Sequence, residues 1–488
     1  MEVATSTLVP LTRKGIPQTL YVSVLKRSKP LETAFLGALS SGAECVSVAV
    51  RGVRWAHPPF ERERFTDPAC WKPNVPVKLS LPMDTFEQIA ERERHFLLST
   101  YNRYPIVLSR GKGVFVYDIE GKRYLDFVSG LGVNALGHAH PRIVMAIREQ
   151  AAKLVHVSNL YYHEYQGPLA EKLCALAGSS SGMSRAFFSN SGTEAIEGSI
   201  KLARLAGHRA GGEAKCRLVA LEGSYHGRTF GALSLTGQDK HRKGFEPLLE
   251  DVTFVKQNDL EGLRAAVNDN TCAIVLEPIF GEGGIHECSV EFLQECRTLA
   301  DRHRVALIFD EIQCGLGRTG TMFAFQSFGV TPDIVAIAKP IAAGLPLGAF
   351  IAKEEFATAI APGQHGTTFG GGPLACRIAL EFLAIIEEEK LLENVNKVGA
   401  YLQHELKGLV EKRAAAIAVR GRGFIQGIQL EIPARPIVDA GLAEGVLFNS
   451  TQDTVVRFLP PFLMEEKHID RGIRVLNKLL GKRRKAAA

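Results

Sequence analysis

The chain has 488 residues, of which 46% are hydrophobic and 23% are charged, and its formal net charge is +6. This length and composition are typical of a globular protein with a large core and more than one domain. No stretch approaches the roughly 20 apolar residues of a membrane span, and no basic face carries a nucleic-acid reading motif, so we expect a soluble protein that binds neither membrane nor nucleic acid.

The nine cysteines are scattered and form no Cys-x-x-Cys pair. This pattern favours reduced thiols in a cytoplasmic protein over a zinc site or a disulfide framework.

The first 82 residues show little periodicity, and residues 51–82 hold six prolines. Such a stretch is typical of an extended linker. Met83 then precedes Asp84 and Thr85, either of which could cap a helix. We therefore expect residues 1–82 to be a poorly ordered extension or a misassigned start, with Met83 as a possible natural first residue.

Residues 110–127 alternate apolar and polar positions around a turn at Glu120-Gly121, which predicts a β-hairpin. We assign residues 83–133 to an N-terminal arm and hairpin that belong to a small domain. His138 and His140 follow; two histidines without a third ligand nearby are more often structural than metal-binding, so we predict no metal site. A helix is expected from Pro141 to about Leu154.

Short apolar runs then alternate with helical patterns, which predicts an α/β fold with a mostly parallel seven-stranded sheet covered by helices. The expected strands span residues 186–188, 217–221, 252–255, 272–276, 305–309, 333–338 and 347–351. We assign residues 134–368 to this large domain. A long helix is expected from Leu374 to about Lys407, inside a C-terminal small α+β domain of residues 369–488.

Polar residues follow four of these strands. Ser191, Gly192 and Thr193 open a predicted helix over residues 194–206, and the free N–H groups there suit a phosphate, although a plain Ser/Thr N-cap gives the same pattern. Further along the chain, Tyr225 and Arg228 follow one strand, Asp310 follows another, and Lys339 follows the next. Ligands of open α/β sheets bind at the carboxyl ends of the strands, so these side chains are candidates for one site.

A lysine and an acid at such an edge suit pyridoxal 5′-phosphate chemistry. The lysine would form an imine with the cofactor, and the carboxylate would keep its ring nitrogen protonated. Taken alone, Lys339 could instead extend to solvent and Asp310 could cap a turn.

Several motifs together resemble the class III (ω-type) aminotransferases of pyridoxal phosphate (PLP) fold type I, and most closely the acetylornithine aminotransferases. The similarity covers roughly residues 95–478. Its motifs occur in the expected order at residues 190–195, 277–284, 309–320 and 365–371.

The resemblance implies a role for each residue that matches a family motif. Lys339 would be the Schiff-base lysine, Asp310 would pair with the ring nitrogen, and Gln313 would face the 3-hydroxyl. Tyr225 would stack on the ring. The residues that would hold the phosphate are Ser191, Gly192, Thr193 and, from a neighbouring subunit, Thr368. A contribution from a second subunit implies a homodimer with shared active sites.

Substrate residues follow from the same resemblance. Arg228 would bind the α-carboxylate of the amino donor, Arg457 would bind a carboxylate from the small domain, and Glu282 would neutralise an arginine in one half-reaction. Ornithine aminotransferases usually have a tyrosine at the position of Leu131, and leucine has no hydroxyl to hold a free α-amino group. Two stretches differ from the family pattern: Phe280 stands where glutamine is common, and Pro340–Ala343 replaces a glycine-rich run.

The resemblance therefore implies a transaminase that moves the δ-amino group of N2-acetyl-L-ornithine to 2-oxoglutarate, giving N-acetyl-L-glutamate 5-semialdehyde and L-glutamate, as in arginine biosynthesis. The alternatives are other ω-aminotransferases, acting on 4-aminobutyrate, ornithine, lysine or succinylornithine. A non-catalytic protein that keeps the PLP fold is a further alternative.

Overall fold

A computed structural model describes residues 9–13, 16–20 and 84–481. The chain divides into two compact units, Met1–Met83 and Asp84–Ala488. In the first unit, strand β1 (Val9–Arg13) pairs antiparallel with strand β2 (Ile16–Leu20). Apart from this pair, the expectations for residues 1–82, including a start at Met83, lie outside the described residues. In the described ranges, no helix combines the length and apolar character needed to cross a membrane.

The second unit begins with the predicted helix. Helix α1 (Phe86–Phe96) starts at Thr85, whose hydroxyl accepts the N–H of Gln88, while the side chain of Gln88 accepts the N–H of Thr85. This reciprocal cap confirms the expected helix start. None of the residues of α1 is buried.

The predicted hairpin is present with an additional strand on each side. Strands β3 (Leu108–Lys112), β4 (Phe115–Asp118) and β5 (Arg123–Asp126) run antiparallel, and β15 (Val446–Leu447) pairs parallel with β5. Segments from the two ends of the unit therefore share one sheet. The domain bounds themselves stay a prediction.

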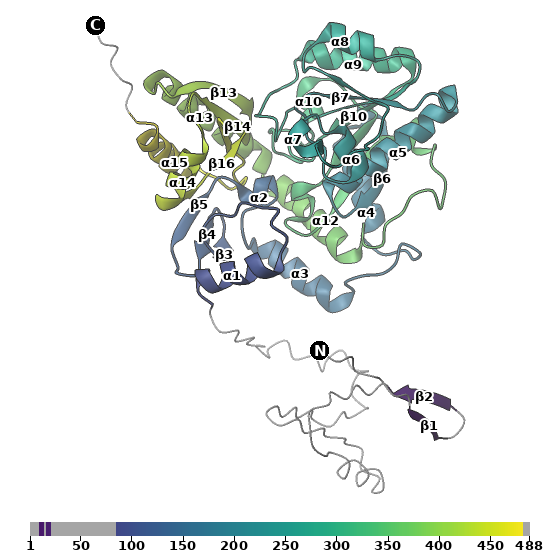
Figure 1. The fold of residues 1–488 in the computed structure, drawn as a ribbon, viewed down its shortest axis with the longest axis horizontal. Helices are drawn as coiled ribbons and strands as arrows, with labels where there is room; N and C mark the ends of the chain where they lie inside the picture. Colours follow the sequence, from purple (N-terminus) through teal and green to yellow (C-terminus); the bar gives the residue numbers. More distant parts are fainter. Residues whose placement is uncertain (1–8, 14–15, 21–83, 482–488) are drawn as a thin grey trace. The chain divides into compact units, whose positions relative to one another are not determined.

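The central sheet has seven strands in the order β6-β12-β11-β10-β9-β7-β8 (Figure 1). Their bounds are β6 Met183–Ser189, β7 Arg217–Leu221, β8 Val252–Val255, β9 Thr271–Leu276, β10 Ala306–Asp310, β11 Ile334–Ile337 and β12 Gly348–Lys353. Only β12 is antiparallel to its neighbours, β11 and β6. All residues of β9, β10 and β11 are buried, which explains their unbroken apolar runs and confirms the predicted sheet.

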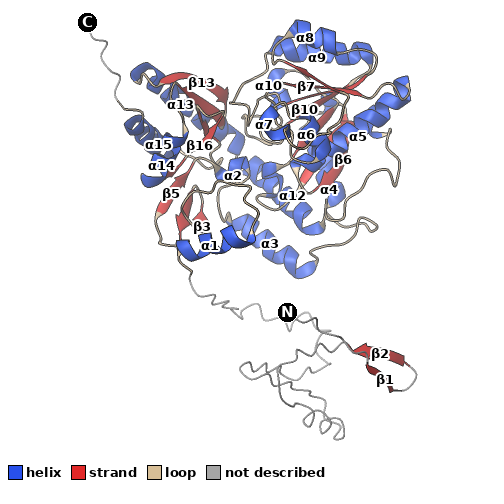
Figure 2. Cartoon of the chain, in the orientation of Figure 1, coloured by secondary structure: helices blue, strands red, loops and turns tan. Residues whose placement is uncertain are grey.

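Helices cover both faces of this sheet (Figure 2). Alternate strand residues enter two different cores: Leu218 and Ile308 pack with helix α5 (Gly192–Gly211), whereas Val219 and Leu307 share a core with helix α9 (Val290–His303). The other helices of the large-sheet region and its surroundings are α2 Ser129–Gly132, α3 Pro141–Lys153, α4 Gln166–Leu176, α6 Phe230–Leu235, α7 Asp239–Arg242, α8 Leu260–Ala266, α10 Ala324–Phe328 and α11 Glu354–Ala357.

The single long helix expected over residues 374–407 is wrong. The chain forms two helices, α12 (Pro373–Glu388) and α13 (Leu391–Lys412), separated at Lys390, whose backbone is left-handed with φ 52°. No glycine or proline marks this break, so the helical periodicity continues across it in the sequence.

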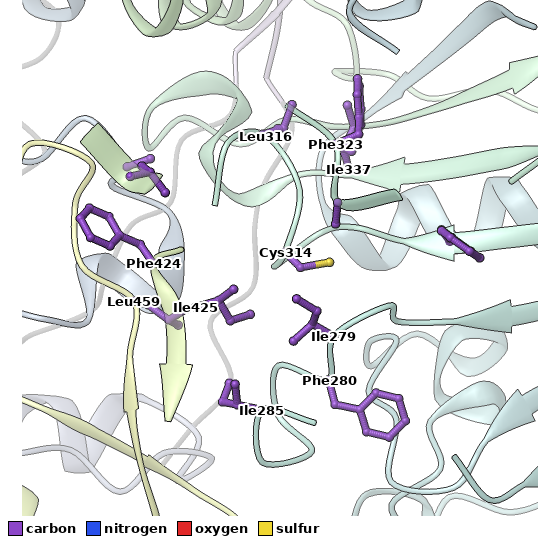
Figure 3. Close-up of a cluster of buried hydrophobic side chains, with 14 of the residues drawn as sticks. Ile279, Phe280, Ile285, Cys314, Leu316, Phe323, Ile337, Phe424, Ile425 and Leu459 are labelled. Carbon is purple, nitrogen blue, oxygen red and sulfur yellow. The ribbon is translucent and has the colours of Figure 1, made fainter. Parts of the chain in front are cut away.

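The C-terminal part forms a further four-stranded sheet, which packs against the loops of the central seven-stranded sheet. Its strand order is β13-β14-β17-β16, with bounds β13 Ala416–Arg422, β14 Ile425–Leu430, β16 Asn449–Thr451 and β17 Val455–Phe458; helices α14 Arg435–Ala443 and α15 Glu466–Leu479 complete it. Figure 3 shows Ile425 of this sheet next to Ile279 and Cys314, which lie in loops of the large sheet, with Leu459 and Phe424 on the same side as Ile425. All five are buried in one hydrophobic core, which fixes these loops relative to β14 and β17.

Candidate active site

A cavity of about 400 Å³ lies at the carboxyl ends of the central strands. Most of the predicted site residues line it: Ser191, Gly192, Thr193, Tyr225, Arg228, Glu282, Asp310, Gln313 and Lys339. They come from loops that follow different strands, as expected for an α/β sheet. Arg457, Leu131 and Thr368 do not line the cavity.

Lys339 and Asp310 lie at the ends of neighbouring parallel strands. Asp310 is the last residue of β10 and pairs with Ala336 of β11, and Lys339 follows β11 at the start of a short 3-10 turn, Lys339–Ala342. Burial lowers the pKa of Lys339, although Glu282 and Asp310 favour its charged form. A lowered pKa favours the neutral amine, which is the nucleophilic form.

Asp310 is held by a histidine to which the sequence analysis gave no role. Its Oδ2 lies 2.8 Å from His226 Nδ1, and its Oδ1 accepts the N–H of Ile312 at 3.1 Å. His226 is buried, and its Nε2 is buried without a hydrogen-bond partner. These contacts fix the carboxylate toward the cavity. The only signal in the sequence is that His226 lies between Tyr225 and Arg228 after a strand.

Glu277 is a second unpredicted residue of the cavity wall. It follows β9, and its two carboxylate oxygens accept the N–H groups of Tyr225 at 2.8 Å and Gly281 at 2.9 Å. Burial and the nearby charge of Asp310 raise the pKa of Glu277 to about 7. Both residues it holds are next to the site, so Glu277 orders the loops that carry Tyr225 and Glu282.

The first turn of α5 provides the donors for a phosphate. The hydroxyl of Ser191 caps this helix by accepting the N–H of Glu194 at 3.3 Å, and Thr193 Oγ1 accepts the N–H of Arg228 at 3.3 Å. The first N–H groups of the helix have no intrahelical acceptor. A Cβ on Gly192 would lie 2.8 Å from the side chain of Ile312, so a larger residue here would force that side chain to move.

The residues of this cavity fit the cofactor that the sequence predicts. The phosphate donors of α5, the ring of Tyr225, the carboxylate of Asp310 and the amine of Lys339 all line the same space. On the other side, a Cβ built on Gly132 would lie 3.8 Å from Lys339 Cδ, which is ordinary van der Waals contact, so this backbone segment borders the lysine. Phosphate, ring face, ring nitrogen and aldehyde each therefore have a chemically suitable neighbour.

Arg457 and Glu282 form an ion pair beside the cavity. Arg457, on β17, is 1% exposed, and its Nη1 donates to Glu282 Oε1 at 2.6 Å and to the carbonyl of Gly281 at 3.0 Å. Its Nε donates to Asn449 Oδ1 at 3.0 Å, a partner that the sequence did not predict. Burial alone would raise the pKa of Glu282, but the Arg457 guanidinium holds it below its ordinary value. Gln313 joins the group, since Arg457 Nη1 lies 3.2 Å from its Oε1.

Arg228 lies at the outer side of the cavity. Its side chain is exposed, its guanidinium lies 5.6 Å from the ring centre of Tyr225, and its Nε donates to the Tyr225 hydroxyl at 3.3 Å. It has a free face toward solvent and can therefore meet an incoming carboxylate.

Leu131 and Thr368 lie outside the cavity wall. Leu131 is 40% exposed and has a left-handed backbone with φ 62°, next to the Gly132 that approaches Lys339. Thr368 is exposed, and its neighbour Thr367 accepts a hydrogen bond from Asn190 Nδ2 at 3.1 Å. Both residues are thus adjacent to site elements without contributing to the cavity in one chain.

The histidines and cysteines give no metal centre in the part of the chain that the structure describes. His138 Nε2 lies 2.8 Å from Asp126 Oδ2, and His140 lies 3.5 Å from Glu389. The cysteines within residues 84–481 are free thiols, namely Cys174, Cys216, Cys272, Cys288, Cys296, Cys314 and Cys376.

Comparison with known proteins adds independent information. Residues 98–480 match the family described as aminotransferase class-III. The acetylornithine aminotransferase of Methanocaldococcus jannaschii is 46% identical over 393 residues, which cover 80% of this chain and 98% of that protein. The enzyme of the same name from Aquifex aeolicus is 45% identical over 385 residues, covering 79% of this chain and all of that protein.

Solved structures agree with the fold. The ornithine aminotransferase of Toxoplasma gondii ME49 superposes with a TM-score of 0.78 at 29% identity, covering 82% of this chain and 96% of that one. A second structure of the Toxoplasma gondii enzyme is described with partial occupancy of PLP at its active site. The acetylornithine aminotransferase of Elizabethkingia anophelis gives a TM-score of 0.72 at 31% identity, with 81% and 99% coverage.

Proposed function

This chain belongs to the class III aminotransferases, PLP-dependent transaminases, and we propose on that basis that its amino donor is N2-acetyl-L-ornithine. The δ-amino group would pass to 2-oxoglutarate, and the products would be N-acetyl-L-glutamate 5-semialdehyde and L-glutamate, a step of arginine biosynthesis. The observation that carries the proposal is the single cavity shared by Lys339, Asp310 and the first turn of α5. The names of the relatives at 46% and 45% identity support the choice of donor.

The residues of the cavity suggest how the cofactor would be held. Lys339 would carry its aldehyde carbon, Asp310 would face its ring nitrogen, Gln313 its 3-hydroxyl, and Tyr225 its ring face. The phosphate would be bound by Ser191, Gly192 and Thr193. When bound, the cofactor supplies an aldehyde that takes up the amino group and a ring that withdraws electrons from the reacting carbon.

The chain's own residues would then move the proton. Once the substrate amine has replaced it, Lys339 would take a proton from the donor carbon that bears the amino group. It would return that proton to the former aldehyde carbon of the cofactor. Its lowered pKa supports the base role, because the neutral amine accepts the proton. The Asp310 carboxylate, which His226 holds in place, would keep the ring nitrogen protonated, and a protonated ring accepts electrons more readily.

Two arginines would select the substrates. Arg228 would bind the α-carboxylate of the donor, and Arg457 would bind a carboxylate of 2-oxoglutarate after Glu282 has moved aside. While the donor is bound, Glu282 neutralises Arg457 through their ion pair. Leucine at position 131 leaves no hydroxyl for a free α-amino group, which favours an N-acetylated donor over ornithine.

We further propose that the enzyme is a cytoplasmic homodimer in which Thr368 reaches the phosphate site of the partner. The segment of Thr368 adjoins a loop with large exposed apolar side chains, since Asn159 Nδ2 donates to the carbonyl of Gly370 at 3.1 Å. The exposed apolar residues of these two segments are Leu160, Tyr161, Tyr162 and Phe369. An apolar surface of this kind is expected to be covered by another chain.

A half-reaction assay tests the proposed donor. The PLP-loaded enzyme is mixed with N-acetylornithine, ornithine, lysine, succinylornithine or 4-aminobutyrate in turn, and the loss of visible cofactor absorbance is followed. N-acetylornithine should give the highest second-order rate. A faster reaction with another amine would reassign the donor, and no reaction with any amine would leave a non-catalytic PLP-binding protein.

A further inference from the structure

Strand β16 brings two polar side chains to the ion pair of Arg457 and Glu282. Asn449 stands directly opposite Arg457 in the antiparallel pairing of β16 with β17, and Thr451 lies two residues further along β16, on the same face. The side-chain oxygen of Asn449 accepts from Arg457, whereas the hydroxyl of Thr451 donates to the backbone carbonyl of Glu282 at 2.7 Å. One short strand therefore contacts both members of the pair.

Asn449 holds one edge of the Arg457 guanidinium. Its Oδ1 accepts from Nε at 3.0 Å and from Nη2 at 2.5 Å. Two N–H groups on one acceptor fix the orientation of this buried, planar side chain. The end formed by Nη1 and Nη2 then faces Glu282, whose Oε1 lies 2.6 Å from Nη1. A substrate carboxylate that replaces Glu282 would meet this same end.

The acceptors around Arg457 differ in charge. Asn449 and Gln313 offer amide oxygens, and Gly281 offers its backbone carbonyl at 3.0 Å. These neutral acceptors satisfy the N–H groups of a buried guanidinium without cancelling its charge. The negative charge comes from Glu282. The charge balance of Arg457 therefore depends on whether the Glu282 side chain is in place.

The contacts of Glu282 restrain its main chain more than its side chain. Its backbone carbonyl accepts from the Thr451 hydroxyl and from Gln452 Nε2 at 2.9 Å, so the chain is held at this position. The side chain is 30% exposed at the cavity wall and can rotate toward solvent. A held cation with a mobile counter-charge can be neutral in one half-reaction and positive in the other.

We propose that Asn449 is a positioning residue for the second substrate. It orients Arg457 through a neutral oxygen, so that the guanidinium keeps its positive charge for a carboxylate of 2-oxoglutarate once Glu282 has turned away. The proposal rests on the transaminase function proposed above and deepens it. Asn449→Asp would keep the oxygen that accepts both N–H groups, but its added charge could not leave. Arg457 would then be neutralised in both half-reactions, and the half-reaction that needs its charge would be impaired.

Single-turnover measurements of the two half-reactions test this role. The pyridoxamine phosphate form of Asn449→Asp is mixed with 2-oxoglutarate, and its PLP form is mixed with N-acetylornithine, each over a range of concentrations. The concentration of 2-oxoglutarate at half-saturation should rise at least about tenfold, the loss expected for one charge-assisted hydrogen bond. The value for N-acetylornithine should stay within about twofold of wild type, because Arg457 is already neutralised in that half-reaction.

Asn268→Asp is the matched control. The Oδ1 of Asn268 also accepts an N–H, that of Asn270 at 3.0 Å, so this substitution too adds a charge and keeps the accepting oxygen. Asn268 precedes β9 and lies at the amino end of that strand, whereas the site lies at the carboxyl ends. It should change neither half-reaction.

A double variant separates the effect of charge from local damage. Glu282→Gln alone leaves Arg457 without its full counter-charge and should slow the N-acetylornithine half-reaction. Adding Asn449→Asp should restore that half-reaction, because a fixed carboxylate replaces the lost one. The same double variant should still need at least about tenfold more 2-oxoglutarate than Glu282→Gln. Damage to the packing of β16 would produce no such restoration.

The outcomes separate the role of Asn449 from the function on which it rests. Equal changes in both half-reactions of Asn449→Asp, no change in either, or no restoration in the double variant overturns the role of Asn449. Failure of the wild-type protein to react with either substrate overturns the proposed function. If Asn449→Asp does not fold, Asn449→Ser, which shortens the neutral acceptor, should weaken 2-oxoglutarate selectively, and an equal effect on both substrates overturns the proposal.

Discussion

The ion pair between Glu282 and Arg457 makes a quantitative prediction for Glu282→Gln. Arg457 has five N–H groups, and its Nε and Nη2 donate to Asn449 while its Nη1 donates to Gly281, Glu282 and Gln313. An incoming carboxylate can bind two parallel N–H groups only if Glu282 gives up its own. The glutamate is therefore a competitor for the second substrate, and the amide of glutamine is a weaker one.

The magnitude follows from the loss of one charge in that contact. A hydrogen bond to a charged group is worth about 1.5–3 kcal/mol and a neutral one about 0.5–1.5 kcal/mol, a difference of roughly 1 kcal/mol or more. The Glu282 side chain is 30% exposed, so we take the lower end, about 1 kcal/mol, or about fivefold. Glu282→Gln should thus strengthen the binding of 2-oxoglutarate about fivefold, and should slow the N-acetylornithine half-reaction, because Arg457 is then buried without a full counter-charge.

Single-turnover absorbance measurements of each half-reaction check this prediction. Glu295→Gln is the matched control, since Glu295 pairs with Arg264 at 2.8 Å on the surface, and it should change neither half-reaction. Equal changes in both half-reactions of Glu282→Gln, or no change in either, would refute the competition.

Four further outcomes are expected. Lys339→Ala should lose the visible absorbance of the bound cofactor after gel filtration and nearly all turnover, because no other amine lines the cavity of the described chain. Leu131→Tyr should raise the ratio of ornithine to N-acetylornithine activity in steady-state assays, since the hydroxyl can hold a free α-amino group. Co-expressed chains carrying Lys339→Ala and Thr368→Ala should form mixed dimers with one intact site, so that their activity exceeds that of either parent; no gain would contradict a shared site. Burial lowers the pKa of Lys339 from its ordinary value of 10.5, so between the lowered pKa and 10.5 this group binds more protons in the unfolded chain, and its contribution to the stability of the cofactor-free protein rises with pH. Lys339→Met should reduce this slope and raise the melting temperature at pH 7, as measured by calorimetry.

The strands and the residues at their ends could be predicted because their signals are local. Strands buried on both faces, such as β10, are short apolar runs, and Asp310 interrupts such a run at its end. Because the parallel strands end at the same edge of the sheet, residues that are distant in the sequence come together there. The seven-stranded sheet and the family are therefore both confirmed.

The contacts between loops could not be predicted in this way. His226 and Asp310 lie 84 positions apart, and nothing in either local pattern states that they bond. Glu277 and Asn449 act through backbone and side-chain contacts that depend on the packed loops. The break between α12 and α13 at Lys390 could not be predicted for a different reason. A left-handed backbone at a residue other than glycine cannot be recognised from the amino-acid type.

The reversed direction of β12 links the two ends of the cofactor site. Since β12 runs against β11, the backbone that leaves Lys339 turns and re-enters the sheet at Gly348 without leaving the cavity edge, and Gly348 pairs with Ser189 just before the phosphate-binding turn. A Cβ at Gly348 would lie 2.2 Å from the carbonyl oxygen of Ser191, so the two segments touch backbone to backbone. The eight residues of main chain between Lys339 and Gly348, together with this one direct contact, therefore set the distance between the amine and the phosphate donors.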